Sequence, residues 1–245
     1  MPAPVTSKSD AAERLRSHLA DVREQRTAIR AAPALARDRL ALREWQAERL
    51  ARTHRDLLDS PRYGAAAAFF LSDLYGPKDF AARDEGIARI LPMLVRMLPA
   101  TALDAIALAV ELDALSERLD LALARRLRRG QPDGPLVIAE RSYADAYRGA
   151  AARSERERQL ALVVRIGTEL DRLARKGLVA GAIALMEAPA RAAGLEALHD
   201  FLARGFRAFR GMRGADEFLA TIAARERRIV ALLYDGAPQP FGRDA

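Results

Sequence analysis

The chain contains no cysteine, which excludes disulfide bonds, thiolate metal sites and a cysteine nucleophile. Histidine is almost as scarce, because only His18, His54 and His199 occur among 245 residues. Lysine occupies only three positions, so arginine supplies nearly all of the positive charge. No apolar run approaches the ~20 residues that a membrane-spanning helix needs. We therefore expect neither thiol chemistry nor a membrane span.

Hydrophobic residues make up 50% of the chain and charged residues 30%, a balance typical of a soluble folded protein. The formal net charge is +7, which could indicate a nucleic-acid partner. An arginine- and alanine-rich composition, however, often reflects a GC-rich genome, which weakens that inference. The first ten residues, MPAPVTSKSD, lack the apolar core of a signal peptide, so we expect a cytoplasmic protein.

Apolar residues recur with the 3.6-residue period of helices, and the alternation typical of strands persists nowhere. The sequence therefore predicts an all-α bundle of about eight to ten helices. We expect a disordered tail over residues 1–9, one helical domain over 10–235 and a frayed tail over 236–245. The clearest linker, QPDGP, could mark a subdomain break at 130–135.

The densest run of aromatic residues lies in the stretch Ser60–Gly86. Ser60–Pro61 predicts a helix start, because serine can cap a free amide and proline loses no hydrogen bond at the first helical position. The small side chains of Ala65–Ala68 allow a neighbouring helix to approach closely, so Phe69–Phe70 should fill a core. Gly76–Pro77 should end this helix.

Part of this stretch carries a family resemblance. The segment Phe69–Gly76, FFLSDLYG, resembles the motif of a bacterial family named for the sequence FFLEELY. Asp79 and the pair Arg83–Asp84 resemble the continuation of that family's pattern. Ser72 and Asp73 replace the two glutamates of the name-giving motif, which keeps one acid and loses the other. The resemblance implies a bacterial all-α protein and implies no reaction, since the family has no established activity.

His54 lies on a long predicted helix that begins at Leu35 and ends near Asp59, just before the aromatic stretch. An imidazole facing an apolar pocket could serve as an axial haem ligand or a general base. The simpler interpretation is a partly exposed helical histidine. His199, close to Phe201, has the same two interpretations.

Glu111 stands in an otherwise apolar predicted helix, so we expect it to be buried and paired with Arg83 or Tyr63. No Glu-x-x-His pair occurs, and the spacing of the acids specifies no metal cage, so we predict neither a metal site nor a cofactor. A structural polar network is the favoured interpretation over a catalytic one. The candidate pocket or network comprises His54, Tyr63, Asp73, Tyr75, Asp79, Arg83, Asp84 and Glu111.

Two functions of different classes fit this sequence. The first is a binding or protein-interaction module with a protein partner or as a homodimer. The second is a helical bundle that binds a small molecule or a cofactor such as haem or a metal, and that could be an enzyme.

The arginine-rich segments ARRLRRG and ARERR do not add nucleic-acid binding to these two functions. The first lies at a predicted helix C-terminus, where the helix dipole favours cations, and no helix-turn-helix pattern accompanies either. We therefore do not expect nucleic-acid binding.

Overall fold

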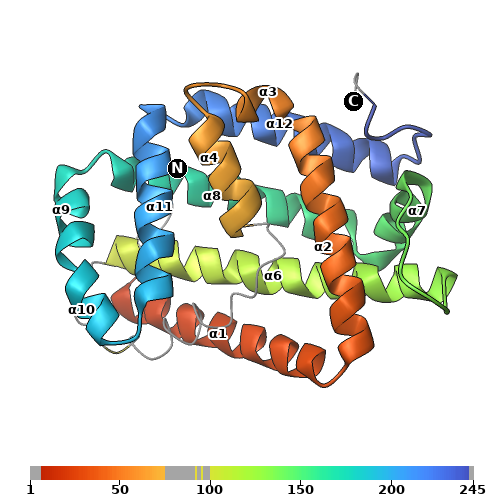
Figure 1. The fold of residues 1–245 in the computed structure, drawn as a ribbon, viewed down its shortest axis with the longest axis horizontal. Helices are drawn as coiled ribbons and strands as arrows, with labels where there is room; N and C mark the ends of the chain where they lie inside the picture. Colours follow the sequence, from red (N-terminus) through yellow and green to blue (C-terminus); the bar gives the residue numbers. More distant parts are fainter. Residues whose placement is uncertain (1–6, 75–91, 93–94, 96–99, 243–245) are drawn as a thin grey trace.

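The computed structural model describes residues 7–74, 92, 95 and 100–242. These residues form eleven α-helices and one π-helical segment and contain no strand, which confirms the all-α prediction (Figure 1). The elements are α1 (Lys8–Arg30), α2 (Pro33–Thr53), α3 (Arg55–Leu58), α4 (Gly64–Phe69), η1 (Phe70–Leu74, π-helical), α6 (Ala100–Gly130), α7 (Glu140–Ala150), α8 (Arg153–Ala174), α9 (Gly177–Leu185), α10 (Glu187–Ala192), α11 (Glu196–Met212) and α12 (Asp216–Tyr234).

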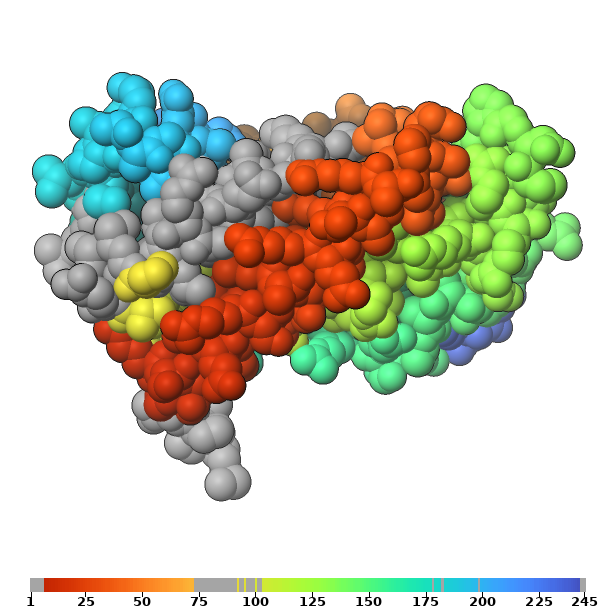
Figure 2. Space-filling model, turned by 90° about the horizontal axis from the view of Figure 1, so that it is seen from below, coloured from red at the N-terminus to blue at the C-terminus, as the bar shows by residue number. Residues whose placement is uncertain are grey.

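Helix α6 is the longest element and runs through the middle of the molecule, where it contacts α1, α2, α7 and α8 (Figure 1). Its alanine and leucine content favours a long uninterrupted helix. Helix α1 lies along one side of it and covers part of the face seen in Figure 2. Leu15, Leu19 and Val22 of α1 pack there against Ala107 and Val110 of α6. Burial of these apolar stripes stabilises the pair.

The first two helices begin close to their predicted positions. Ser7 caps α1 by accepting a hydrogen bond from the Asp10 amide at 3.1 Å, so α1 starts at Lys8, two residues before the expected start of the helical domain at residue 10. Pro33 occupies the first turn of α2, as expected for a residue without an amide proton.

The predicted long helix up to Asp59 is wrong at one point, because the helix breaks at His54. The backbone of His54 is non-helical, with φ −113° and ψ 27°, and the short helix α3 follows it. The Thr53 hydroxyl donates to the Arg49 carbonyl, and the Arg225 side chain of α12 donates to the Thr53 carbonyl. The Leu57 amide bonds the His54 carbonyl at 3.0 Å, so Arg225 takes the place of the helical donor at the Thr53 carbonyl.

The aromatic stretch starts its helix later than predicted. The Ser60 hydroxyl accepts hydrogen bonds from the amides of Arg62 and Tyr63, both at 3.2 Å. These bonds close a turn over residues 61–63, so α4 begins at Gly64 instead of Pro61. Helices α4 and α11 approach closely at Gly205 of α11, since a Cβ there would meet the Phe69 ring at 2.8 Å.

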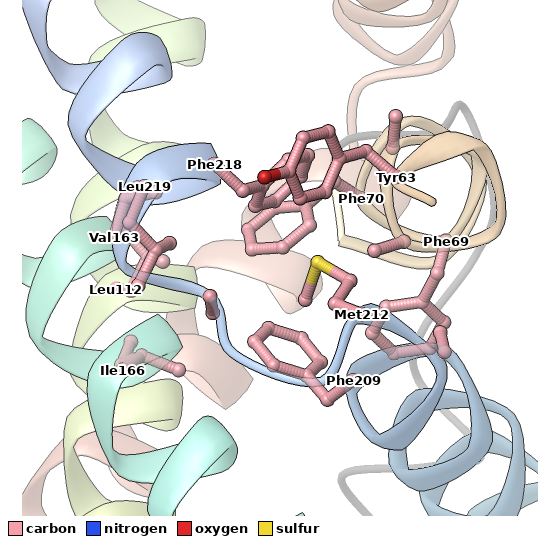
Figure 3. Packing of buried hydrophobic residues seen from close by; sticks show 14 of the residues in the cluster. Tyr63, Phe69, Phe70, Leu112, Val163, Ile166, Phe209, Met212, Phe218 and Leu219 are labelled. Carbon is pink, nitrogen blue, oxygen red and sulfur yellow. The ribbon is translucent and has the colours of Figure 1, made fainter. Parts of the chain in front are cut away.

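The largest apolar cluster joins α4, α6, α8, α11 and α12, and Figure 3 shows its aromatic centre. The Phe70 ring lies 5.8 Å from Phe209 and 5.7 Å from Phe218, so the prediction that Phe70 is a core residue is confirmed. Phe218 also lies 5.6 Å from the Tyr63 ring. Helices α8 and α12 approach closely at Gly167, where any side chain would clash with Leu219.

A second apolar cluster joins α2, the end of α6, α7 and α12. The single tryptophan, Trp45, stacks on Tyr143 with ring centroids 4.2 Å apart. Tyr147 lies 5.6 Å from Tyr143 on the next turn of α7. Phe241 contacts Trp45 and Tyr143 edge-on, and thereby attaches the chain beyond α12 to this cluster.

Candidate functional site: a cavity with a charged end

A cavity of about 470 Å³ lies between the helices of the bundle, within the size range of small-molecule sites. Its apolar wall comes from α4, η1, α9, α11 and the later turns of α8. Its polar wall comes from α2, α7, α12, the middle of α6 and the start of α8. Figure 1 places α7 and α2 on one side of the molecule and α9 and α11 on the other. Residues on the apolar wall include Phe69, Phe70, Val163, Ile166, Phe201, Phe206 and Phe209. Residues on the polar wall include Arg43, Gln46, Arg49, His54, Asp120, Tyr143, Tyr147, Arg156, Gln159 and Glu226.

Glu226 of α12 organises the first group on the polar wall. Arg49 Nη1 donates to both carboxylate oxygens, at 2.6 and 2.8 Å, and His54 Nε2 lies 2.9 Å from Oε1. An ionised carboxylate can only accept, so Nε2 of His54 carries the proton of this bond. In a neutral ring Nδ1 is then an acceptor, and it is buried without a partner among the described residues. The carboxylate orients the imidazole on the cavity wall.

The charge state of Glu226 follows from its neighbours. Burial raises the pKa of its carboxyl group, but the charge of Arg49 and the hydrogen bonds from His54 and Arg49 outweigh this effect and lower the pKa to about 2. Glu226 is therefore ionised at neutral pH. The Arg49–Glu226 pair joins α2 to α12 at the cavity.

The lowered pKa predicts acid sensitivity. The pKa of Glu226 falls on folding from its ordinary 4.5 to about 2, so its contribution to stability is present above 4.5 and is lost as pH falls towards 2. We expect the difference in unfolding free energy between the wild type and Glu226→Gln to shrink from about pH 6 to about pH 3. Urea unfolding across this pH range measures it. Exposed Glu187, replaced in the same way, should show no such change, and a pH-independent Glu226→Gln difference would contradict the assignment.

A second group of charges joins α2 to α6. Arg43 bonds Glu117 at 3.0 Å and Asp120 at 3.3 Å, and Arg39 contacts Glu117 at 3.2 Å. The Glu117 side chain is 2% exposed. Burial raises its pKa and outweighs the opposing charges of Arg43 and Arg39. Asp38 and Arg128 extend the same interface by a further ion pair. These acids and arginines pair with one another across the α2–α6 interface, although Glu117 Oε1 and Arg39 Nε have no hydrogen-bond partner among the described residues, and we interpret the group as structural.

Arg156 of α8 differs from these arginines. It is 3% exposed, donates to Gln159 Oε1 at 3.3 Å and lies over the Tyr147 ring at 4.3 Å. Its Nε and Nη2 atoms are buried without a hydrogen-bond partner among the described residues, and no ion pair joins it to a described carboxylate. A buried guanidinium without a counter-ion costs folding free energy. Arg156 is therefore the one cation on the polar wall whose placement the described packing does not explain.

Residues 25–240 match a family described as a domain of unknown function, DUF8198. The chain belongs to this family. No curated protein and no solved structure matches it. The description of DUF8198 gives no activity, so the function must be argued from the site. Within the described ranges, no helix is long and apolar enough to cross a membrane, and no group of three histidine or acidic side chains could hold a metal ion.

Of the three predicted pocket residues whose side chains the structure describes, His54, Tyr63 and Glu111, His54 alone lies on the cavity wall. It is buried and paired with Glu226, so the interpretation as a partly exposed histidine is wrong. His199 lies elsewhere, with Nε2 2.9 Å from the Ile183 carbonyl. Tyr63 donates to Glu217 at 2.5 Å, and this bond together with partial burial raises the pKa of Tyr63.

Glu111 is largely buried, with its side chain 15% exposed, and it is paired, but the expected pairing with Tyr63 is wrong. It accepts from Arg158 at 2.5 Å, with His18 3.8 Å away. Helix α6 packs against α1 on one side and α8 on another. Glu111 lies between these two faces, within reach of His18 of α1 and Arg158 of α8. Of the remaining candidates, the Asp73 side chain, Tyr75, Asp79, Arg83 and Asp84 lie outside the described residues.

Proposed function

We propose that this protein binds a small, largely apolar molecule in its central cavity. The observation that carries the proposal is the cavity itself, whose volume of about 470 Å³ and phenylalanine-rich wall suit such a ligand. A few polar groups at one end, including His54 and Arg156, would fix the orientation of the ligand. This is the second of the two functions that the sequence suggests.

The cavity wall includes positions that solvent reaches. Leu202 of α11 is 48% exposed and Ala109 of α6 is exposed, and both line the cavity. A ligand could enter beside these residues without the core having to open. Ala109 is also a suitable position for a larger side chain that would fill the cavity, because it lines the cavity and is exposed.

Saturable binding of the neutral fluorescent amine N-phenyl-1-naphthylamine tests the proposal. We expect Ala109→Phe to weaken binding at least about tenfold, because the new ring occupies the space of the ligand. The control is Ala220→Phe, an exposed position of α12 away from the cavity, which should bind like the wild type. The probe's own fluorescence reports binding, and Trp45, which stacks on the wall residue Tyr143, provides a second signal. Absence of saturable binding, or equal binding by both variants, would contradict the proposal.

A protein partner or a homodimer is the second candidate. Leu185 is 83% exposed and Met186 follows it at the junction of α9 and α10, which gives this corner an apolar surface. Light scattering of the purified protein, compared with the variant Leu185→Glu, tests whether this corner joins two copies.

We infer further that the protein is cytoplasmic and bacterial, as the composition and the FFLEELY resemblance suggest. Phe69 and Phe70 of that segment lie in the core and Leu71 lies on the cavity wall. The segment therefore belongs to the proposed binding site and not only to the packing.

A further inference from the structure

We infer that the ligand is an amphipathic organic anion, whose carboxylate, sulfonate or phosphate group is bound by Arg156. The inference rests on the proposed function and names the chemical class of the ligand. The inference is based on the ion pairs of the cavity wall: the described carboxylates there contact arginines, whereas Arg156 contacts no described carboxylate.

Each described carboxylate on the wall already contacts an arginine. Glu226 is held by Arg49, Asp120 by Arg43, and Asp113 by Arg26 at 3.0 Å. Arg156 has the face of Tyr147, one side-chain amide oxygen and the nearby Tyr234 hydroxyl, and no ion pair joins it to a described carboxylate. Among the described residues of the cavity wall, Arg156 is thus the arginine that no carboxylate contacts. An anionic ligand would neutralise its charge.

The free atoms of Arg156 form a single edge of its guanidinium group. Nε and Nη2 are the two nitrogens whose N–H bonds point the same way, and both lack a partner among the described residues. This edge matches the two oxygens of a carboxylate, sulfonate or phosphate and binds them in a bidentate manner. The remaining nitrogen, Nη1, donates to Gln159, and the Tyr147 ring supports the plane from one face. These contacts hold Arg156 in place before a ligand arrives.

The arrangement of the walls gives the ligand its orientation. Arg156 lies on the second turn of α8, whereas Val163 and Ile166 of the same helix lie on the apolar wall beside the phenylalanines (Figure 3). An anion at Arg156 would therefore place the apolar body of the ligand along α8 towards α11. A neutral apolar molecule would leave the guanidinium edge unpaired.

The test compares two probes with the same aromatic body. 1-Anilinonaphthalene-8-sulfonate is N-phenyl-1-naphthylamine with one added sulfonate. We expect Arg156→Met to weaken binding of the sulfonate probe about 10- to 100-fold and to change binding of the neutral probe by less than about threefold. Arg153→Met is the matched control, because this arginine lies one turn earlier on α8, is exposed and has carboxylate partners. Both probes should bind this control as they bind the wild type.

The outcomes separate the inference from the proposed function. The anion inference would be overturned if the wild type and Arg156→Met bound the sulfonate probe equally well. It would also be overturned if Arg156→Met lost the same affinity for both probes. In either case, binding of the neutral probe by the wild type would still support the cavity. Failure of both probes to bind the wild type would overturn both. If Arg156→Met does not fold, as near-ultraviolet circular dichroism would show, Arg156→Lys replaces it. Lysine keeps the charge without the bidentate edge, so the sulfonate should still lose affinity relative to the neutral probe.

Discussion

Replacing Glu226 with alanine is expected to lower the free energy of unfolding by about 3–5 kcal/mol. Arg49, which bonds both oxygens of this carboxylate, would remain buried without a counter-ion. His54 would at the same time lose the bond from its Nε2 atom. Urea unfolding at neutral pH, followed by Trp45 fluorescence, measures the effect.

The control for this variant is Glu157→Ala on α8. Glu157 also contacts an arginine, Arg153, at 3.0 Å, but its side chain is 55% exposed. Exposed ion pairs contribute little, so we expect a loss below about 1 kcal/mol. A loss of the same small size for Glu226→Ala would contradict the view that Glu226 anchors α2 to α12.

The second large effect is expected for Phe218→Ala, at about 3–5 kcal/mol. Phe218 is fully buried, and its ring lies 5.6 Å from the Tyr63 ring and 5.7 Å from the Phe70 ring in the cluster shown in Figure 3. Truncation would leave a void between the first turn of α12 and the rings of Tyr63 and Phe70, because the surrounding backbone cannot collapse into it. The same unfolding experiment measures the change.

Phe70→Ala provides an informative comparison, because the Phe70 ring packs in the same cluster but also lines the cavity. We expect a smaller loss than for Phe218→Ala, since part of its surface faces the cavity instead of packed side chains. Leu202→Ala, at a half-exposed position, should cost less still. A loss below about 1 kcal/mol for Phe218→Ala would contradict the core assignment.

The helical architecture was predictable from the sequence, because the apolar period of each long helix is set by local residues alone. The break at His54 was not. It depends on Arg225 and Glu226, which lie about 170 residues further along the chain and bond the Thr53 carbonyl and the His54 ring. No local pattern around Thr53 contains that information.

The charged end of the cavity was equally hidden in the sequence. Arg156 stands in the polar segment SERERQ, which is typical of an exposed helix start. Its burial depends on tertiary packing, in which Tyr147 of α7 lies over the guanidinium group. Glu226 likewise stands in the cluster ARERR, whose net charge suggests a basic surface. A single acid among arginines could have signalled an internal ion pair, but its partner Arg49 is distant in sequence.

The most direct test of the binding cavity is an intermolecular NMR experiment with N-phenyl-1-naphthylamine. Methyl groups of Val163 and Ile166 line the cavity, whereas those of Leu185 lie on the exposed corner between α9 and α10. We predict nuclear Overhauser effects from the probe to Val163 and Ile166 and none to Leu185. Contacts to Leu185 alone would place the probe on the surface and contradict the account of a ligand-binding cavity.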